Sequence, residues 1–142
     1  MHQLMLPRDA NPAGNVHGGL IMKMVDEAGA LAAMRHANSQ VVTISMDSMS
    51  FKSPVHVGQL LMLDARLTYV GRTSMEVVVK VLAEDAVVGK VTHTNSARLV
   101  YVALGANGEP TMVPQLLCES EEEQREFELG RQRQKSRLGS AS

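Results

Sequence analysis

The feature that most constrains the fold is a single long helical pattern followed by a series of strand patterns. Apolar residues recur at three- and four-residue steps from Gly18 to about His36, which predicts one helix with a wide apolar face. From Val41 to Leu104 apolar and polar residues alternate, which predicts four long strands, the first continuing to Phe51 and the last running from Ala86 to Val102. A short apolar run at residues 2–6 predicts a fifth strand. One helix covers only one face of such a sheet, so the remaining apolar surface indicates self-association.

Three turn-rich breaks separate the predicted strands, at Ser53-Pro54 with Gly58, at Gly71-Arg72 and at Glu84-Asp85. A Gly-X pair between two alternating runs, such as Gly71-Arg72, predicts a two-residue hairpin of type II′ and antiparallel neighbours. Inside the helix, Gly29 would cost about 1 kcal/mol relative to alanine. We therefore expect another group to pack very close to the second half of the helix.

Residues 116–142 differ in character from the body of the domain, residues 1–115. Ser120 with Glu123 matches a capping box, and acidic residues crowd the first turns while basic residues crowd the last ones. This pattern predicts a charged C-terminal helix over residues 119–137 that is solvated and frays into residues 139–142. The charge run is typical of a soluble helix face.

Composition excludes several classes of function. The chain has 14 basic and 15 acidic residues, so no basic surplus is present for nucleic acid. A single cysteine, Cys118, excludes an intrachain disulfide and a Cys-rich metal site, and fits a reducing compartment. No apolar run is long enough to span a membrane, and the N-terminus lacks the regions of a signal peptide. We expect a cytoplasmic protein without metal, membrane or nucleic acid.

The residues around the start of the helix are the candidates for chemistry. Gly18 and Gly19 leave exposed N–H groups that attract a polarised carbonyl oxygen or an anion. Asp26 lies eight residues after Gly18, about 12 Å along a helix, so a carbonyl held at the helix start is too far from it within one chain. A two-fold axis with antiparallel helices would instead pair Asn15 of one subunit with Asp26 of its mate.

Each candidate also has a purely structural interpretation. Asp26 could be an exposed carboxylate paired with Lys23 or Arg35. Asn15, between a glycine and a valine before a helix, could be a turn former or a cap. His17 could act as a general base, or it could donate a hydrogen bond that fixes the loop.

At these positions the sequence resembles the acyl-CoA thioesterases of the hotdog fold, in particular the cytosolic acyl-CoA hydrolase branch. The likeness covers residues 3–104 and depends on motifs in the expected order, namely Gly14-Asn15-Val16-His17-Gly18-Gly19, Met24-Val25-Asp26-Glu27-Ala28-Gly29, Arg35-His36, Phe51-Lys52-Ser53-Pro54-Val55 and Gly71-Arg72-Thr73-Ser74. The resemblance implies an α+β hotdog fold, in which a curved antiparallel sheet of about five strands wraps a long central helix. It also implies a dimer with a continuous sheet, and commonly a trimer of dimers, which is a homohexamer.

The activity that the resemblance implies is hydrolysis of fatty acyl-CoA to free fatty acid and CoA, without a metal or other cofactor. Asn15 and Asp26 would be catalytic, with Asp26 as general base on a water or, alternatively, as a nucleophile. The amides of Gly18 and Gly19, in a loop that also holds His17, would stabilise the oxyanion.

Coenzyme A carries phosphate charges, so a protein that binds it needs local basic groups. Within Gly71-Arg72-Thr73-Ser74 the candidate cation is Arg72, with the two hydroxyls as neighbours. Lys52 and Ser53 are candidates for lining the pantetheine path. Both cations could equally be exposed surface residues.

Two other functions remain open on the sequence. A 3-hydroxyacyl-thioester dehydratase or hydratase of the same fold would use His17 with Asp26 to move a proton. A non-catalytic acyl-CoA-binding protein would keep the pocket without turnover. Asn15 and the double glycine favour the hydrolase.

Overall fold

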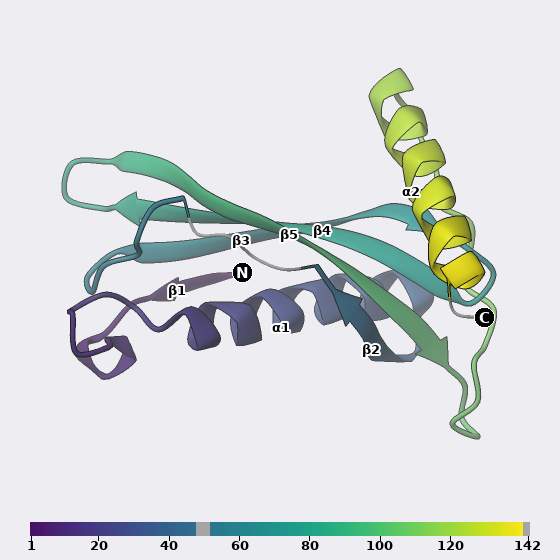
Figure 1. Cartoon of the computed structure of the whole chain (residues 1–142), viewed down its shortest axis with the longest axis horizontal. Coiled ribbons are helices and arrows are strands. Elements are labelled where there is room, and N and C mark those ends of the chain that lie inside the picture. The colour runs from purple at the N-terminus through teal and green to yellow at the C-terminus, as the bar shows by residue number, and fades with distance from the viewer. Residues whose placement is uncertain (48–51, 141–142) are drawn as a thin grey trace.

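The computed structural model describes residues 1–47 and 52–140 (Figure 1). Its elements in chain order are β1 (His2–Leu4), the 3-10 turn η1 (Pro7–Asp9), α1 (Gly18–Ala37), β2 (Gln40–Met46), β3 (Leu60–Val70), β4 (Ser74–Asp85), β5 (Lys90–Leu104) and α2 (Glu121–Ser140). The strands form one antiparallel sheet in the order β1-β3-β4-β5-β2. The predicted α+β architecture, with one long helix and a curved sheet of five strands, is confirmed.

α1 packs across the inner face of the sheet because its apolar side chains form one stripe. The buried residues of the helix are Ile21, Met24, Val25, Ala28, Gly29 and Ala33. They meet alternate, inward-facing residues of the long strands, which are Leu61, Leu63, Met75, Val77, Val79, Val81, Leu99 and Tyr101. Each fully buried Val or Leu contributes about 1.5–3 kcal/mol, so this stripe fixes the rotation of α1 on the sheet.

β2 is an edge strand with apolar side chains that one chain leaves exposed. It pairs with β5 alone, and the side chains of Val42 and Ile44 are 43% and 57% exposed. An exposed apolar edge strand offers unpaired backbone groups to another chain. The leftover apolar surface that the sequence predicted therefore lies partly at this edge.

The turns differ in detail from the sequence-based expectation. β3 and β4 do form a tight hairpin, in which the Gly71 N–H donates to the Ser74 carbonyl at 2.9 Å. Gly71 does not have the positive φ that the first central residue of a type II′ turn requires, so the predicted turn type is wrong. The next turn follows Asp85 and ends at Gly89, whose φ is +74°. The last strand therefore starts at Lys90 instead of the expected residue 86. The expected continuation of β2 to Phe51 lies outside the described residues.

α2 is exposed over most of its length, as the sequence predicts, but one side of it packs on the sheet. It crosses the outer face of the sheet, opposite α1 (Figure 1). Gly130 is buried and packs so closely on Tyr69 of β3 that a Cβ there would collide with it. The ring of Phe127 meets the ring of Tyr69 edge to face, with 4.9 Å between the ring centroids. The helix also continues through Ser140, so the predicted fraying from residue 139 is wrong for residues 139 and 140.

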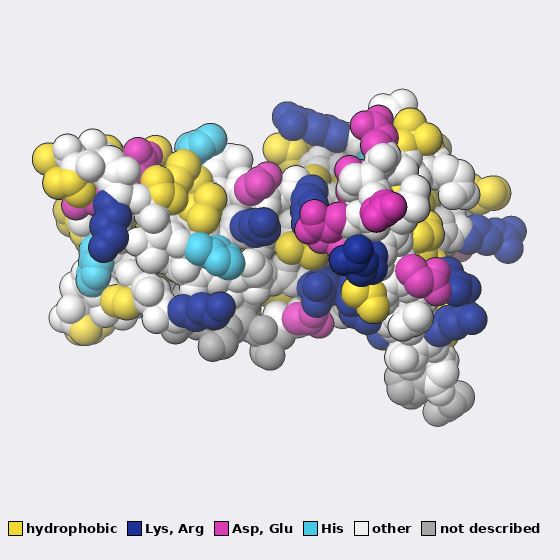
Figure 2. All heavy atoms as spheres, turned by 90° about the horizontal axis from the view of Figure 1, so that it is seen from above, with side chains coloured by type: hydrophobic (Ala, Val, Ile, Leu, Met, Phe, Trp, Pro, Cys, Tyr) yellow, Lys and Arg dark blue, Asp and Glu magenta, His cyan; other side chains and the backbone are white. Residues whose placement is uncertain are grey.

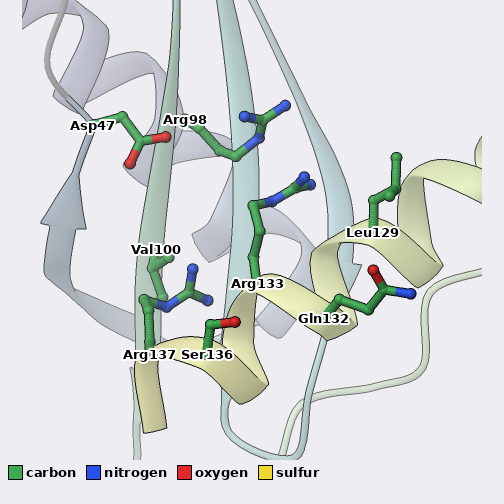
Figure 3. Close-up of a pocket in the computed structure, with 8 residues that line it drawn as sticks. All are labelled: Asp47, Arg98, Val100, Leu129, Gln132, Arg133, Ser136 and Arg137. Atoms are coloured by element: carbon green, nitrogen blue, oxygen red, sulfur yellow. The ribbon is translucent and has the colours of Figure 1, made fainter. Parts of the chain in front are cut away.

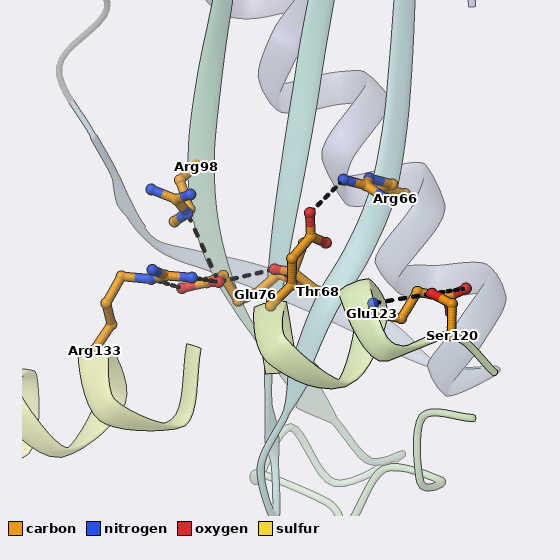
Figure 4. A network of polar contacts seen from close by, with 8 residues as sticks. Arg66, Thr68, Glu76, Arg98, Ser120, Glu123 and Arg133 are labelled. Atoms are coloured by element: carbon orange, nitrogen blue, oxygen red, sulfur yellow. Dashed lines mark hydrogen bonds and ion pairs between the residues drawn. The ribbon is translucent and has the colours of Figure 1, made fainter. Parts of the chain in front are cut away.

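A buried ion pair holds α2 on the sheet. The side chain of Glu76 on β4 is fully buried, and Arg133 of α2 donates two hydrogen bonds to it at 2.7 and 2.9 Å (Figure 4). The Thr68 hydroxyl donates to the same carboxylate at 2.8 Å, and Arg98 lies 3.7 Å away. Burial would by itself raise the pKa of Glu76, but these hydrogen bonds and positive charges outweigh it and lower that pKa.

The first turn of α2 is capped nearly as the sequence predicts. The Ser120 hydroxyl accepts a hydrogen bond from the Glu123 N–H at 3.1 Å. The Glu123 carboxylate accepts one from the Ser120 hydroxyl at 3.3 Å, where a full capping box would have it accept from the Ser120 N–H. The helix start is therefore stabilised by one half of the motif.

Charges of both signs are mixed on the face that carries α2. Figure 2 shows basic and acidic side chains interspersed over the part of this face that α2 covers. Among the described residues, no helix has the length and apolar character needed to cross a membrane.

Candidate functional site

Asp26 lies on α1 beside strands β2 and β5, where two hydroxyl groups hold one of its carboxylate oxygens. The Thr43 hydroxyl of β2 donates to Asp26 Oδ1 at 2.9 Å, and the Tyr101 hydroxyl of β5 lies 3.0 Å from the same oxygen. Asp26 forms no salt bridge with Lys23 or Arg35 in the described part of the chain. Lys23 instead lies 3.9 Å from Glu27. Asp26 is therefore a half-buried carboxylate with a fixed orientation.

Tyr101 reaches Asp26 because Gly29 leaves room for it. The tyrosine side chain is fully buried, and its hydroxyl also lies 3.0 Å from the backbone carbonyl oxygen of Asp26. A Cβ at Gly29 would overlap this hydroxyl. The group that the sequence predicted to pack against Gly29 is thus Tyr101 of the same chain. Burial and the Asp26 charge raise the pKa of Tyr101, so the phenol stays a neutral donor.

The loop before α1 is closed by its own backbone and by Asn11. Asn11 Oδ1 accepts hydrogen bonds from the backbone N–H groups of Ala13 and Asn15 at 3.0 and 3.1 Å. The Val16 N–H donates to the Val55 carbonyl at 2.8 Å, which ties the loop to residues 55–56. Asn15 is half-buried, and its side chain has no hydrogen-bond partner in the described part of the chain. The Asn11 side-chain NH₂ likewise has none there.

The helix start has the open amides that the sequence predicts. His17 is the N-cap residue and is exposed, and its side chain makes no capping hydrogen bond. Its backbone N–H donates to the Asp9 carbonyl at 3.0 Å, and its carbonyl accepts from Leu20. The first helical residues, Gly18 and Gly19, are glycines, and nothing lies within 4 Å of a Cβ built on Gly19. A ligand can therefore approach this backbone closely.

The predicted CoA-binding residues lie at two distant places in one chain. The Lys52 N–H donates to the Thr94 carbonyl, whereas the Thr73 carbonyl accepts from Ala103. Nine residues of β5 separate these two contacts, about 30 Å at 3.3 Å per residue. One chain therefore does not bring Lys52 and Ser53 together with the β3–β4 hairpin.

Within that hairpin, only part of the predicted set faces solvent. Arg72 is exposed and Thr73 is half-buried. Ser74 is 9% exposed, and its hydroxyl accepts a hydrogen bond from Gln134 of α2 at 3.0 Å. The side chain of Gln134 also lies over Gly71. In this chain, Arg72 and Thr73 are the hairpin residues most open to a ligand.

A cavity of about 460 Å³ lies between α2 and the outer face of the sheet, away from Asp26. Figure 3 shows Arg98, Arg133 and Arg137 among the residues around it, with Asp47 at its edge. Arg98 and Arg133 also face Glu76, so the cavity lies beside the ion pair that holds α2 on the sheet. In residues 1–47 and 52–140, no three His, Cys, Asp or Glu side chains gather as metal ligands would.

The sequence indicates Asp26 as a candidate but does not indicate the residues that hold its carboxylate, Thr43 and Tyr101. Thr43 and Tyr101 are directly opposite each other on β2 and β5, so both side chains point to the same face of the sheet. The alternation of β5 could have placed Tyr101 on the inner face. On β2 the apolar residues Val42 and Ile44 flank Thr43, so the pattern predicts the opposite face for Thr43. The pairing register between the two strands, which the sequence does not state, is what brings both hydroxyls to one carboxylate.

Comparison with known proteins places this geometry in a family. A family profile described as "Thioesterase superfamily" matches residues 13–90. The cytosolic acyl coenzyme A thioester hydrolase of Rattus norvegicus is 37% identical over 92% of this chain, which covers 35% of that protein.

Two solved structures share the whole fold. An apo-hexameric acyl-CoA thioesterase is 42% identical with a TM-score of 0.91, and the match covers 100% of this chain and 91% of that chain. The acyl-CoA hydrolase of Staphylococcus aureus, solved with butyryl coenzyme A and coenzyme A, is 34% identical with a TM-score of 0.88 over 99% and 86% of the two chains. Three variants of that hydrolase replace an aspartate, a threonine and an asparagine with alanine.

Proposed function

Because the chain belongs to the thioesterase superfamily, we propose that it hydrolyses the thioester of fatty acyl-CoA and releases a free fatty acid and CoA. Its relatives support an acyl-CoA substrate, since they are named acyl-CoA thioester hydrolases and acyl-CoA thioesterases. We propose that the reaction uses side chains and backbone amides alone, without a cofactor.

The observation that carries this proposal is the tethered carboxylate of Asp26. In the Staphylococcus aureus hydrolase the replaced aspartate follows the replaced asparagine by 15 positions, and the threonine follows the aspartate by 17. Here Asp26 follows Asn11 by 15 positions, and Thr43 follows Asp26 by 17. The three residue types at the same two spacings support Asp26 as the catalytic base.

Two asparagines are candidates for the second catalytic residue. Asn15 precedes the double glycine, and its side chain has no partner among the described residues, which supports its proposed role beside the helix start. The spacing supports Asn11, whose oxygen is engaged with the loop while its NH₂ group is left to donate to a thioester carbonyl. Of the two, we favour Asn11.

We propose that each site is shared between two copies of the chain. The exposed apolar edge of β2 supports antiparallel pairing with β2 of a second copy, which would continue the sheet. On α1, Met22 lies one turn before Asp26 and is 42% exposed, as expected beside a partner. Solved neighbours described as hexameric support three such dimers per assembly.

The proposed reaction is a water-mediated hydrolysis. Asp26 removes a proton from a water molecule, whose oxygen attacks the thioester carbon and forms a tetrahedral oxyanion. The N–H groups of Gly18 and Gly19 and the asparagine NH₂ from the other copy stabilise that charge. The intermediate collapses, the carbon–sulfur bond breaks, and the CoA thiolate takes the proton from Asp26. His17 holds the loop through its backbone.

For the CoA moiety we propose contacts from two protomers. Arg72, with Thr73, would meet phosphate oxygens from one copy, and Lys52 with Ser53 would meet the CoA from another. The separation of about 30 Å along β5 supports this division, because one chain cannot present both sets to the same CoA molecule.

The first test separates hydrolysis from hydration. With saturated fatty acyl-CoA and with crotonyl-CoA as substrates, we expect free thiol to appear in a one-to-one ratio with free acid. Thiol reagent and mass spectrometry of the acyl product measure both. Hydration of crotonyl-CoA without thiol would support the dehydratase or hydratase, and binding without any product would support the acyl-CoA-binding protein.

The second test asks which asparagine completes the site. Asp26→Ala is co-refolded with Asn11→Ala in one experiment and with Asn15→Ala in another. Random pairing makes half of all dimers mixed, and each mixed dimer has one intact site of two, so about a quarter of wild-type activity returns with the catalytic asparagine. We expect this recovery with Asn11→Ala.

Each single variant refolded alone is the control for that experiment. The non-catalytic asparagine variant should be active by itself. If both asparagine variants were inactive alone and neither recovered activity with Asp26→Ala, the shared site would be wrong.

A further inference from the structure

We propose that Tyr101 is a positioning residue that tethers Oδ1 of Asp26 and leaves Oδ2 as the oxygen that takes the proton. This inference rests on the proposed function of Asp26. It assigns different roles to the two oxygens of one carboxylate, and it assigns a role in turnover to a tyrosine that lies wholly inside the core.

The geometry distinguishes the two oxygens. Oδ1 accepts from the Thr43 hydroxyl at 2.9 Å and lies 3.0 Å from the Tyr101 hydroxyl. Oδ2 has no hydrogen-bond partner within residues 1–47 and 52–140. A carboxylate oxygen with two donors has its lone pairs occupied, whereas a free one can accept a proton from water. Oδ2 is therefore the reactive oxygen.

The tether is stiff because its two donors come from one cross-strand pair. Thr43 and Tyr101 are register partners on β2 and β5, so their Cα atoms lie about 4.5–5.5 Å apart and their side chains leave the sheet together. The Tyr101 hydroxyl also lies 3.0 Å from the backbone oxygen of Asp26. One phenol thus contacts both the side chain and the backbone of the same residue.

Burial makes this contact specific to tyrosine. Tyr101 is 0% exposed, so its hydroxyl has no water to turn to, and the missing Cβ of Gly29 creates its space. A phenylalanine would fill the same volume and lose only the hydroxyl. Oδ1 would then keep one donor, and the carboxylate could rotate more freely about its terminal torsion.

The neighbouring charges do not replace this effect. On α1 the nearby charged residues, Lys23 and Glu27, lie 3.9 Å from one another. β2 carries no charged residue from Gln40 to Met46, and Tyr101 is the titratable group of β5 that contacts Asp26. The two hydroxyl groups are therefore what orients the carboxylate, and removing the Tyr101 hydroxyl leaves Thr43 as its one remaining side-chain donor in the described part of the chain.

The test compares Tyr101→Phe with Tyr69→Phe. The chain has two tyrosines, and Tyr69 is also buried but faces α2 on the outer side of the sheet, so it is a matched control. We expect Tyr101→Phe to lower kcat about tenfold to a hundredfold with little change in KM, as for the loss of a hydrogen bond to a charged group. Tyr69→Phe should match the wild type in both kcat and KM.

A second variant reaches the same tether from the other side. Gly29→Ala keeps the phenol but pushes its hydroxyl away from Asp26, so it should also lower kcat with little change in KM. An unchanged kcat in Tyr101→Phe would overturn the tether while Asp26→Asn stayed inactive. Activity retained in Asp26→Asn would instead overturn the proposed function itself.

Discussion

Replacing Asp26 with asparagine should lower kcat for acyl-CoA hydrolysis by about 10²- to 10⁴-fold, the range for loss of a general base. Asparagine has nearly the same shape, and its Oδ1 can still accept the hydrogen bonds from Thr43 and Tyr101. The amide nitrogen that replaces Oδ2 cannot take a proton from water. The variant should therefore fold and bind acyl-CoA normally while losing turnover.

The measurement is the rate of thiol release at saturating acyl-CoA. Binding of a product analogue and the thermal unfolding temperature are measured on the same preparation, to show that the variant still binds and folds. Glu27→Gln is the control, because it changes a charge at the next residue of α1 that is exposed and lies near Lys23. We expect this control to keep wild-type kcat. Equal losses in the two variants would mean that charge on this face of α1 matters and that Asp26 has no special role.

The sequence indicates Asp26 as a candidate because a carboxylate in an apolar helix pattern is conspicuous. It also indicated a close approach at Gly29, although it could not say that the approaching group is Tyr101. That contact depends on the register of β2 against β5, and register is set by many weak side-chain preferences. Asn11, which we propose for the site, gives no comparable signal in the sequence, since a loop asparagine followed by a proline is typical of a turn former.

The inner half of the fold follows from periodicity, whereas the outer half does not. The alternation around Met75 and Val77 predicts β4 correctly and makes Glu76 look like a solvent-facing residue between them. Its partner, Arg133, is 57 residues further along the chain, within a run of charges typical of a solvated helix. Local patterns carry no information on such a pairing, so only the structure shows how α2 is held on the sheet.

The ion pair between Arg133 and Glu76 leads to the second large expected effect. Arg133→Gln should lower the free energy of unfolding by about 3 kcal/mol, at the low end of the cost of removing one partner from a buried ion pair. The Glu76 side chain is fully buried, so its charge cannot be hydrated once Arg133 is gone. Thr68 and Arg98 remain beside it and limit the loss.

Arg131→Gln is the matched control on the same helix. Arg131 also donates two hydrogen bonds to a glutamate, Glu128, but both side chains are nearly half exposed. Exposed pairs contribute about 0–1 kcal/mol, so this variant should unfold at almost the wild-type urea concentration. Both variants must be compared at equal protomer concentration, because self-association adds to apparent stability.

The loss in Arg133→Gln should also depend on pH in one direction. In the wild type the pKa of Glu76 is held below 4.5, so the pair stabilises the fold above that pH and loses its contribution as the pH falls through the lowered value. In the variant, burial without Arg133 raises that pKa, and protonation relieves the buried charge. The difference in unfolding free energy should therefore be largest near neutral pH and shrink in acid. A difference that stayed constant from about pH 7 to about pH 4 would mean that Arg133 stabilises α2 by packing and not by its charge.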